Sequence, residues 1–362
     1  MSNIKLRVAI VGAGINGICI GWELAKAGYQ VTIFERDSII SHTSRASSKL
    51  LHGGLRYLEN GEFRLVREAL LERHKWFQDA PSNLAKPLCM LLPVYRNSKR
   101  SRWLLKLGLS LYDLFARDSG LPSHMWLQRN EVLLKDPFLK PEGLLGAFQF
   151  WDGVMDDQKL GFWAAKQACE AGAIIHEGLG VETVDINGKI KLLNGSLEEF
   201  DYVINAAGPW SKFLLGQSGL SSSHDLDLVR GSHIVLNRPL RSACLFEVPG
   251  ERRIFFVLPW QDGTLVGTTE VRQKFLESVS PSNDEITYLI QAYNAYFSHP
   301  VDENDIRETF AGVRPLVKSA QDPSRATREY ALEKKHKLIN VFGGKWTTAR
   351  ALARQVHKLV EM

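Results

Sequence analysis

The sequence has 362 residues, 44% of them hydrophobic and 23% charged, and a formal net charge of +5. This balance indicates a folded globular protein and excludes a disordered chain. So small a net charge gives no reason to expect nucleic acid as a partner. The length exceeds what one hydrophobic core usually supports, so we expect two structural domains.

The sequence also bears on where the protein works. Its first residues run directly into a strand pattern, so no signal peptide is expected, and no run of about 18 apolar residues predicts a membrane span. The cysteines lack both paired spacing and metal-ligand spacing, which predicts reduced thiols in a cytoplasmic protein and no metal site. They are Cys19, Cys89, Cys169 and Cys244.

A strand, a glycine-rich turn, a helix and a second strand open the chain. Residues 5–11 (KLRVAIV) are typical of a central parallel strand, and residues 18–28 have apolar side chains at helical spacing with Gly28 as the C-cap. Residues 30–35 predict the next strand. Together they form a complete βαβ unit in about 30 residues.

The turn of this unit carries the pattern GxGxxG at Gly12, Gly14 and Gly17. The first glycine allows the tight turn, the second lets the backbone approach a pyrophosphate, and the third lets the helix pack closely on the strand. The free N–H groups at the helix N-terminus favour phosphate. Glu35 ends the second strand, where its carboxylate can accept hydrogen bonds from a ribose diol. The unit therefore predicts a dinucleotide site.

The later chain alternates helices and strands. We predict an amphipathic helix at 62–79, a less regular strand-and-loop region at 87–150, and strands joined by turns at 225–320. The other predicted elements are a helix returning to a strand at 156–178, a strand pair turning at Asn194-Gly195, a buried strand at 201–210, and a terminal strand, Gly-Gly turn and helix at 337–360.

Two late segments favour FAD over NAD as the dinucleotide. VINAAGPW (203–210) and FGGKWTTARAL (342–352) look like strand-to-helix turns of small residues, far from the first βαβ unit. FAD is long and needs several loops along its length. A helix starting near Thr347 would point its N-terminus at the flavin, where it favours the negative charge that develops on reduction. The alternative is that GGK only starts a helix.

These elements predict an α/β fold, with a Rossmann-like FAD-binding domain assembled from discontinuous segments. An inserted α+β substrate-binding domain would carry a mainly antiparallel sheet. The predicted FAD-binding domain comprises residues 1–85, 150–220 and 305–362, and the substrate-binding domain comprises residues 86–149 and 221–304.

One segment is locally basic. Residues 95–106 (YRNSKRSRWLLK) hold five basic residues and no acid, and the apolar LGLSLYDLF follows. Such a segment can dock on anionic lipid headgroups. The competing interpretation is a solvated loop followed by a packed helix, which is the commoner meaning of a charge run.

Ten stretches in order along nearly the whole chain resemble FAD-dependent glycerol-3-phosphate dehydrogenases, within the D-amino-acid-oxidase-like flavoproteins. The stretches are VGAGINGI, TSRASSKLLHGGLRYLENGEFRLVREALLER, VMDDQKL, VINAAGPW, RGSHIVL, FFVLPW, VGTTE, GVRPLV, ATREYAL and FGGKWTTAR. Members of this family commonly continue with a helical C-terminal domain, which we expect this chain, ending at Met362, to lack. Glu270 stands where the family usually has aspartate.

The resemblance implies an enzyme with non-covalent FAD that oxidises sn-glycerol 3-phosphate to dihydroxyacetone phosphate by hydride transfer from C2 to the flavin. Electrons would pass to quinone or another acceptor, and the protein could attach peripherally to the cytoplasmic membrane face through residues 96–106. Two alternatives are a soluble FAD-dependent oxidase or dehydrogenase of another hydroxy or amino acid, and a non-catalytic FAD-binding subunit.

The matching motifs supply the predicted substrate residues. A phosphate dianion calls for guanidinium and other donors, and a secondary alcohol calls for a base near its hydroxyl. His233 is the candidate partner of that hydroxyl and a candidate general base. The substrate-binding set is Arg56, Tyr57, His233, Arg314, Arg328 and Lys345, of which His233, Arg314, Arg56 and Lys345 are the predicted catalytic group.

The predicted cofactor residues follow the same motifs. Ser47 to Lys49 and the pair Gly53-Gly54 would run along the flavin, and His52 would contact it or serve the structure. We interpret Asp156-Asp157 as structural. The full predicted set is Gly12, Gly14, Ile15, Asn16, Gly17, Glu35, Arg36, Thr43, Ser44, Ser47, Ser48, Lys49, Leu50, His52, Gly53, Gly54, Val181, Ala206, Ala207, Gly208, Trp210, Gly312, Gly344, Lys345, Trp346 and Thr347.

Overall fold

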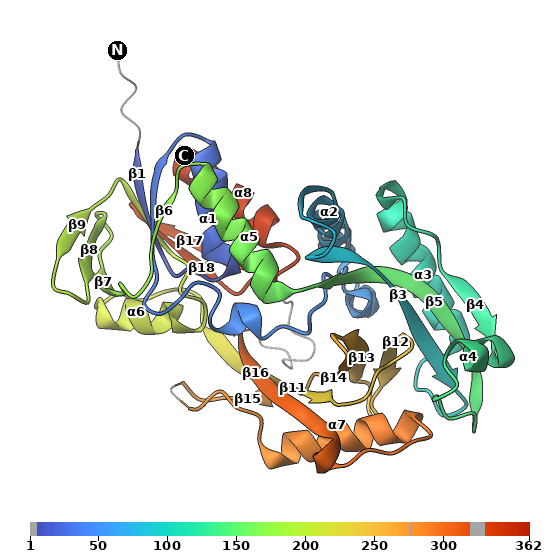
Figure 1. Cartoon of the computed structure of the whole chain (residues 1–362). Coiled ribbons are helices and arrows are strands. Elements are labelled where there is room, and N and C mark those ends of the chain that lie inside the picture. Colours follow the sequence, from blue (N-terminus) through green and yellow to red (C-terminus); the bar gives the residue numbers. More distant parts are fainter. Residues whose placement is uncertain (1–5, 276, 319–329) are drawn as a thin grey trace.

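The computed structural model describes residues 6–275, 277–318 and 330–362. Within these ranges the strands form three sheets, of six, nine and three strands. The two large sheets occupy different halves of the molecule, and the chain passes between them several times (Figure 1). None of the described helices is long and apolar enough to cross a membrane.

The six-stranded sheet has the order β17-β18-β10-β1-β2-β6. All its neighbours are parallel except β17 and β18. Its central strands are almost fully buried because helices cover one face and the small sheet with a short helix covers the other, which explains their unbroken apolar runs. The strands are β1 (Arg7–Val11), β2 (Gln30–Phe34), β6 (Ile174–His176), β10 (Tyr202–Asn205), β17 (Ala331–Lys335) and β18 (Leu338–Phe342).

Three helices from distant parts of the chain pack together on one face of this sheet. α1 (Ile15–Lys26) lies between α5 (Asp157–Glu170) and α8 (Ala349–Glu361), and their apolar faces form one core with β1 and β2. A second core lies against α6 (Ser211–Gln217) and the small sheet. The small sheet consists of β7 (Val181–Val184), β8 (Lys189–Leu192) and β9 (Leu197–Glu199).

The nine-stranded sheet has the order β15-β11-β14-β13-β12-β3-β5-β4, and β16 also pairs with β11. It is antiparallel except for the short contact of β12 with β3. Its strands are β3 (Ala85–Tyr95), β4 (Met125–Gln128), β5 (Leu144–Met155), β11 (Leu226–Leu236), β12 (Ala243–Glu247), β13 (Ile254–Trp260), β14 (Gly263–Gly267), β15 (Val271–Arg272) and β16 (Ile306–Val317).

Four further helices flank this sheet. They are α2 (Phe63–Asp79), α3 (Arg102–Ala116), α4 (Arg129–Lys135) and α7 (Asn283–Tyr296). Ser101 caps α3, and Ser282 and Glu285 form a reciprocal capping box on α7. Short 3₁₀ turns complete the described structure: η1 (Thr43–Arg45), η2 (Leu55–Asn60), η3 (Arg117–Ser119), η4 (Gly208–Trp210) and η5 (Glu303–Asp305).

The predicted fold class is confirmed: a largely parallel sheet is assembled from discontinuous segments, and a mainly antiparallel sheet is inserted between them. The region 87–150 is more regular than predicted. Two of its prolines, Pro87 and Pro93, lie inside β3, which nevertheless pairs with β5 over its full length. β16 belongs to the nine-stranded sheet, whereas the predicted ranges placed residues 305–362 with the FAD-binding domain. The domain ranges themselves stay a prediction.

Candidate active site

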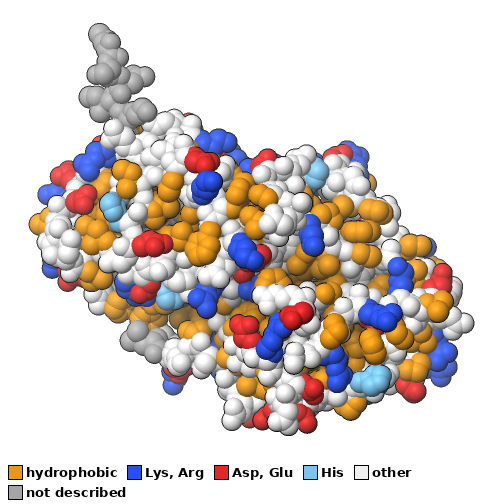
Figure 2. All heavy atoms as spheres, viewed as in Figure 1, with side chains coloured by type: hydrophobic (Ala, Val, Ile, Leu, Met, Phe, Trp, Pro, Cys, Tyr) orange, Lys and Arg blue, Asp and Glu red, His pale blue; other side chains and the backbone are white. Residues whose placement is uncertain are grey.

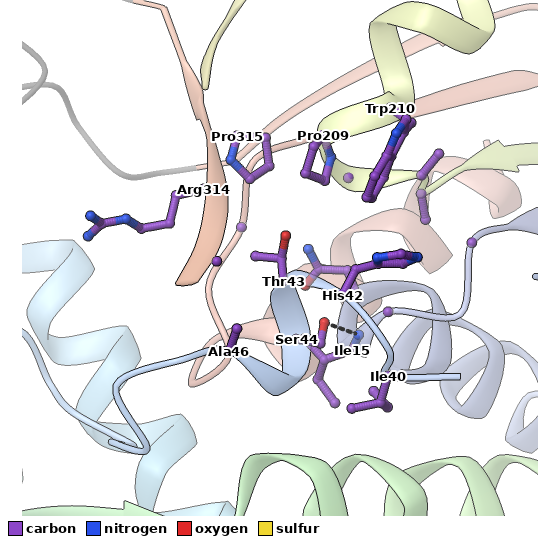
Figure 3. Close-up of a pocket in the computed structure, with 18 of the residues that line it drawn as sticks. Ile15, Ile40, His42, Thr43, Ser44, Ala46, Pro209, Trp210, Arg314 and Pro315 are labelled. Atoms are coloured by element: carbon purple, nitrogen blue, oxygen red, sulfur yellow. Dashed lines mark hydrogen bonds between the residues drawn. The ribbon is translucent and has the colours of Figure 1, made fainter. Parts of the chain in front are cut away.

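The main cavity has a volume of about 440 Å³ and lies where the carboxyl ends of β1 and β10 face β11 and β16. In Figure 3, Thr43 and Ser44 lie opposite Pro209 and Pro315 across the cavity, and Arg314 projects from β16 to one side. The rings of His42 and Trp210 contact each other at a centroid distance of 4.8 Å. A ligand here contacts segments from the beginning, middle and end of the chain, at the usual ligand-binding edge of a parallel sheet.

The glycine-rich turn has the geometry that a bound pyrophosphate needs. Gly12 has φ +100, and a Cβ there would lie 2.8 Å from the Ala206 carbonyl oxygen. A Cβ on Gly17 would lie 1.9 Å from the Gly12 carbonyl oxygen, so only glycine lets α1 pack so closely on the turn. Gly14 provides no side-chain cap for α1, so the first turn of the helix relies on other partners, as anion-binding helix ends do.

Glu35 is fixed at the end of β2. Its Oε2 accepts a hydrogen bond from the Ala13 N–H at 2.7 Å, and its Oε1 accepts one from the Asp37 N–H at 3.0 Å. Each carboxylate oxygen keeps a lone pair for a further donor. Because Glu35 also lines the cavity, the structure places an immobilised acceptor where the sequence predicted a ribose contact.

The loop between β18 and α8 builds another part of the cavity wall, next to the glycine-rich turn. Asn16 Nδ2 donates to the Gly343 carbonyl oxygen at 3.1 Å, and Trp346 Nε1 donates to the Ser44 carbonyl oxygen at 2.7 Å. Among the described residues, the buried Oδ1 of Asn16 and Oγ of Ser41 have no hydrogen-bond partner. Both residues line the cavity, so it offers unsatisfied polar atoms to a ligand. α8 begins two residues after the predicted Thr347.

Most predicted cofactor residues line this cavity. They are Gly12, Gly14, Ile15, Asn16, Glu35, Arg36, Thr43, Ser44, Ser47, Ser48, Leu50, His52, Val181, Ala206, Ala207, Gly208, Trp210, Gly312, Gly344, Lys345, Trp346 and Thr347. Gly54 lines only an adjoining second cavity. Gly17, Lys49 and Gly53 line neither cavity.

Lys49 lies behind the cavity wall. Its Nζ contacts both carboxylate oxygens of Asp157, at 2.8 and 2.9 Å, and donates to the Arg45 carbonyl oxygen at 2.7 Å. The other oxygen contacts of Asp157 come from the N–H and hydroxyl of Ser47, which does line the cavity. The adjacent Asp156 caps α5 through the Lys159 N–H. Both aspartates therefore hold the backbone in place.

A second cavity of about 70 Å³ adjoins the main one, sharing His52, Tyr57 and Arg314 with it. The carboxylate of Glu270 lies in its wall within 4 Å of three guanidinium groups. The distances to Glu270 are 3.9 Å from Arg56, 3.8 Å from Arg314 and 3.7 Å from Arg253. Three converging cations around one carboxylate form a strongly anion-attracting region.

Arg314 is positioned by a buried polar network. Its Nη2 donates to the Thr269 carbonyl oxygen at 2.9 Å. The Thr269 hydroxyl donates to Glu285 at 2.6 Å, and Glu285 also accepts from Ser232 and from Arg230. Although burial opposes ionisation, hydrogen bonds from Thr269, Ser282, Arg230 and Ser232 lower the pKa of Glu285 to about 2. The charged Glu285 thus holds the segment that orients Arg314.

His233 lies on β11 with its ring stacked on Phe310 at a centroid distance of 4.8 Å. A hydrogen bond of 2.9 Å joins its Nε2 to the Ser48 hydroxyl, and its buried Nδ1 has no partner among the described residues. Burial, together with the charges of Lys49 and Arg314, lowers the pKa of His233 to about 3. Its imidazole is therefore neutral at physiological pH and suited to hydrogen bonding.

Of the remaining predicted substrate residues, all that the structure describes line at least one of the two cavities. Lys345 Nζ lies 3.9 Å from the ring centroid of Tyr57, and both residues line the main cavity. With Arg56, Arg314 and His233 they surround the junction of the two cavities. Arg328 lies outside the described residues.

Sequence reasoning missed several contributors. Arg253 lies two residues before the FFVLPW motif, and only the structure shows its ion pair with Glu270. Glu270 was noticed only as a departure from the family pattern. His42, Phe256 and Thr268 line the cavity as well. Phe256 and Thr268 stand inside the FFVLPW and VGTTE motifs, which were the available signal, whereas His42 lies in none of the quoted motifs.

One set of three potential metal ligands occurs among the described residues: Glu35, Asp37 and His42. Asp37 already accepts from His42 at 2.8 Å and from Arg36 at 3.1 Å, and these bonds lower the pKa of Asp37. Glu35 accepts two backbone N–H groups, as described above. The ion pair of Asp37 with Arg36 and the hydrogen bonds of Glu35 and His42 account for this cluster without a metal ion.

A family model described as "FAD dependent oxidoreductase" matches residues 7–359 of the chain. The chain belongs to this family. It is 38% identical to a glycerol-3-phosphate dehydrogenase of Pseudomonas aeruginosa, over 96% of this chain and 70% of that protein. It is 36% identical to a D-erythritol 1-phosphate dehydrogenase of Brucella abortus, over 97% of this chain and 72% of that protein.

A solved structure agrees with the fold. The glycerol-3-phosphate dehydrogenase of Bacillus halodurans, complexed with FAD, superimposes with a TM-score of 0.78 at 25% identity. The match covers 99% of this chain and 65% of that one, so the chain spans about two thirds of the length of its relatives. The resemblance drawn from the ten motifs is confirmed, and so is FAD as the cofactor. The glycine cradle, the fixed Glu35 and the unsatisfied Asn16 and Ser41 fit this group.

Proposed function

We propose that this flavoprotein oxidises sn-glycerol 3-phosphate to dihydroxyacetone phosphate. The observation that carries the proposal is the convergence of Arg56, Arg314 and Arg253 beside the FAD cavity. A phosphate dianion satisfies several guanidinium groups at once. A hydroxy or amino acid would call for one carboxylate clamp, so the surplus of cations favours a phosphorylated polyol.

The chain's own residues account for binding and orientation. FAD, when bound, accepts the hydride from C2. Arg56 and Arg314 hold the phosphate, with Lys345 and Tyr57 beside them, and Arg328 belongs to the same proposed set. His233 accepts a hydrogen bond from the C2 hydroxyl, whose proton is lost as the carbonyl forms. Because its pKa is low, His233 stays neutral and orients the hydroxyl as a hydrogen-bond acceptor. The surrounding cations favour the alkoxide, and the hydroxyl proton leaves to bulk water.

The test is anaerobic mixing of the FAD-loaded protein with three compounds. Glycerol 3-phosphate is expected to abolish the visible absorption of the flavin, and unphosphorylated glycerol to leave it unchanged. D-erythritol 1-phosphate measures how far the site accepts a longer polyol. If no phosphorylated polyol reduces the flavin, the proposal fails. If no hydroxy or amino acid does so either, a non-catalytic FAD-binding subunit is the better interpretation.

We also propose that α3 docks on an anionic lipid surface, from which electrons pass to a quinone. One face of α3 exposes Trp103, Leu104, Leu107 and Leu114, with Trp103 at 76% of its full exposure, and α2 adds the exposed Phe63 in contact with Phe115. Lys99, Arg102 and Lys106 are exposed beside this face. Hydrophobic and basic side chains alternate over the part of the surface where α2 to α4 lie (Figures 1 and 2).

The structure narrows the residues available to lipid. Arg100 forms ion pairs with Glu59 and Glu247 and its side chain is mostly buried, so it is not available to a lipid headgroup. The guanidinium carbon of Arg102 lies 4.0 Å from the ring centroid of Trp126. An apolar face flanked by cations matches an interfacial helix.

Sedimentation with phosphatidylglycerol vesicles at low salt tests the lipid proposal. Wild-type protein is expected to bind, salt to release it, and the double change Trp103→Ser and Leu107→Ser to abolish binding. Leu197→Ser is the matched control, because Leu197 is equally exposed but lies on the small sheet. Wild-type protein that stays in the supernatant would refute lipid docking.

A further inference from the structure

A buried polar network lies between α3 and the turn at Gly53-Gly54. The Tyr112 hydroxyl accepts from the Gly53 N–H at 2.8 Å and donates to Asp152 Oδ2 at 2.9 Å. Asp152 Oδ1 also accepts from the Gly53 N–H at 3.2 Å and from Arg73 at 2.8 Å. Arg73 donates in addition to the Trp151 carbonyl oxygen. Four elements, α2, α3, β5 and the turn, thus meet at one amide.

The protonation states of this network determine which of its groups donate and which accept hydrogen bonds. Tyr112 is fully buried beside a carboxylate, and both effects raise its pKa well above its ordinary value, so the hydroxyl stays protonated. Burial raises the pKa of Asp152, while Arg73 and the hydrogen bonds oppose that rise. Arg73 is therefore the counter-charge that suits a buried carboxylate, and the Gly53 N–H is held by two acceptors.

The turn fixed in this way leads directly into the substrate end of the site. Gly54 has φ +77, and a Cβ there would lie 2.3 Å from the Tyr57 ring. η2 starts at the next residue and carries Arg56 and Tyr57. A Cβ on Gly53 would lie 2.4 Å from Leu70 and 2.6 Å from the Tyr112 hydroxyl. The turn is therefore packed from both sides, and its path sets where η2 begins.

We infer that Tyr112, Asp152 and Arg73 are positioning residues that fix the Gly53-Gly54 turn and, through η2, the side chains of Arg56 and Tyr57. Their part in substrate binding rests on the proposed function, whereas their hold on the turn does not. Asp152 itself forms part of the second cavity wall. The Tyr112 hydroxyl is the link that reaches the turn from α3.

Tyr112→Phe removes only the hydroxyl, and hydrogen exchange of the FAD-loaded protein reads the turn directly. The Gly53 N–H loses its shorter bond, so amides of residues 53–60 are expected to exchange roughly 10-fold faster than in wild type. With glycerol 3-phosphate, KM should rise by a similar factor while kcat changes little, because the phosphate is bound alike in ground and transition states.

Tyr296→Phe is the matched control. The Tyr296 hydroxyl donates to the Glu247 carbonyl oxygen at 2.7 Å in a core that lines neither cavity. It should lower the melting temperature comparably yet leave exchange at 53–60 and KM unchanged. Unchanged exchange at 53–60 in Tyr112→Phe would overturn the inference. That result is independent of the substrate, so a failure of the proposed function is recognised separately, by wild-type flavin that glycerol 3-phosphate does not reduce.

Discussion

Replacing Arg314 by methionine is expected to lower kcat/KM for glycerol 3-phosphate by roughly 10²- to 10³-fold, because charged hydrogen bonds to the phosphate are lost. The side chain is held by the Thr269 carbonyl oxygen and lies 3.8 Å from Glu270. Methionine keeps much of the length and packing but none of the charge. Anaerobic flavin reduction by stopped flow measures the change, with substrate affinity separated from the limiting rate.

Two variants define what the loss means. Arg314→Lys keeps the charge without the planar fork and should fall between wild type and Arg314→Met. Arg307→Met is the matched control, since Arg307 lies on the same strand with similar exposure but bonds to Asp262 and Gln261, outside both cavities. An Arg314→Met protein with normal kcat/KM would exclude Arg314 from phosphate binding.

Replacing Lys49 by methionine is expected to destabilise the protein by about 3–5 kcal/mol, because it leaves a buried carboxylate without its cation. The Lys49 side chain is 8% exposed and that of Asp157 is 1% exposed. Since Asp157 also holds the backbone of Ser47, weaker FAD retention should accompany the loss. Urea unfolding of the FAD-loaded protein gives the free energy.

The neighbouring pair of Lys159 and Asp156 offers the control. Lys159 is 71% exposed, so Lys159→Met should cost less than about 1 kcal/mol. The double change Lys49→Met and Asp157→Leu removes both charges and should recover part of the lost stability. If Lys49→Met is no more destabilising than Lys159→Met, the buried pair is not an important contributor.

The sequence predicts the first βαβ unit well, because the GxGxxG pattern and Glu35 at the end of β2 are set by the local backbone conformation and packing. It predicts the region 87–150 poorly, since β3 is stabilised by a distant partner, β5, and its prolines argue locally against a strand. The paired residues run from Ala85 with Met155 to Tyr95 with Leu144, too far apart along the chain to leave a local signal.

The site shows the same division. Residues within motifs, such as Ser44, Ala206 and Lys345, line the predicted cavity. Lys49 lies in a motif too, but its part is to hold the wall, a distinction that depends on the buried Asp157 more than a hundred residues away. Arg253 joins the cation group through a strand pairing that one sequence does not reveal.

Because the lining of the main cavity comes from distant parts of the chain, FAD can bind only after these parts have assembled. Its lining comes from residues within 11–57, 180–217, 231–268, 312–316 and 343–347. β18, inserted between β10 and β17, completes the sheet beneath it. FAD acts thermodynamically as a non-covalent cross-link between these segments. By linkage, free FAD at about 100 times its dissociation constant adds about 2.7 kcal/mol to the free energy of unfolding. Synthesis must reach the last strand before that stabilisation becomes available.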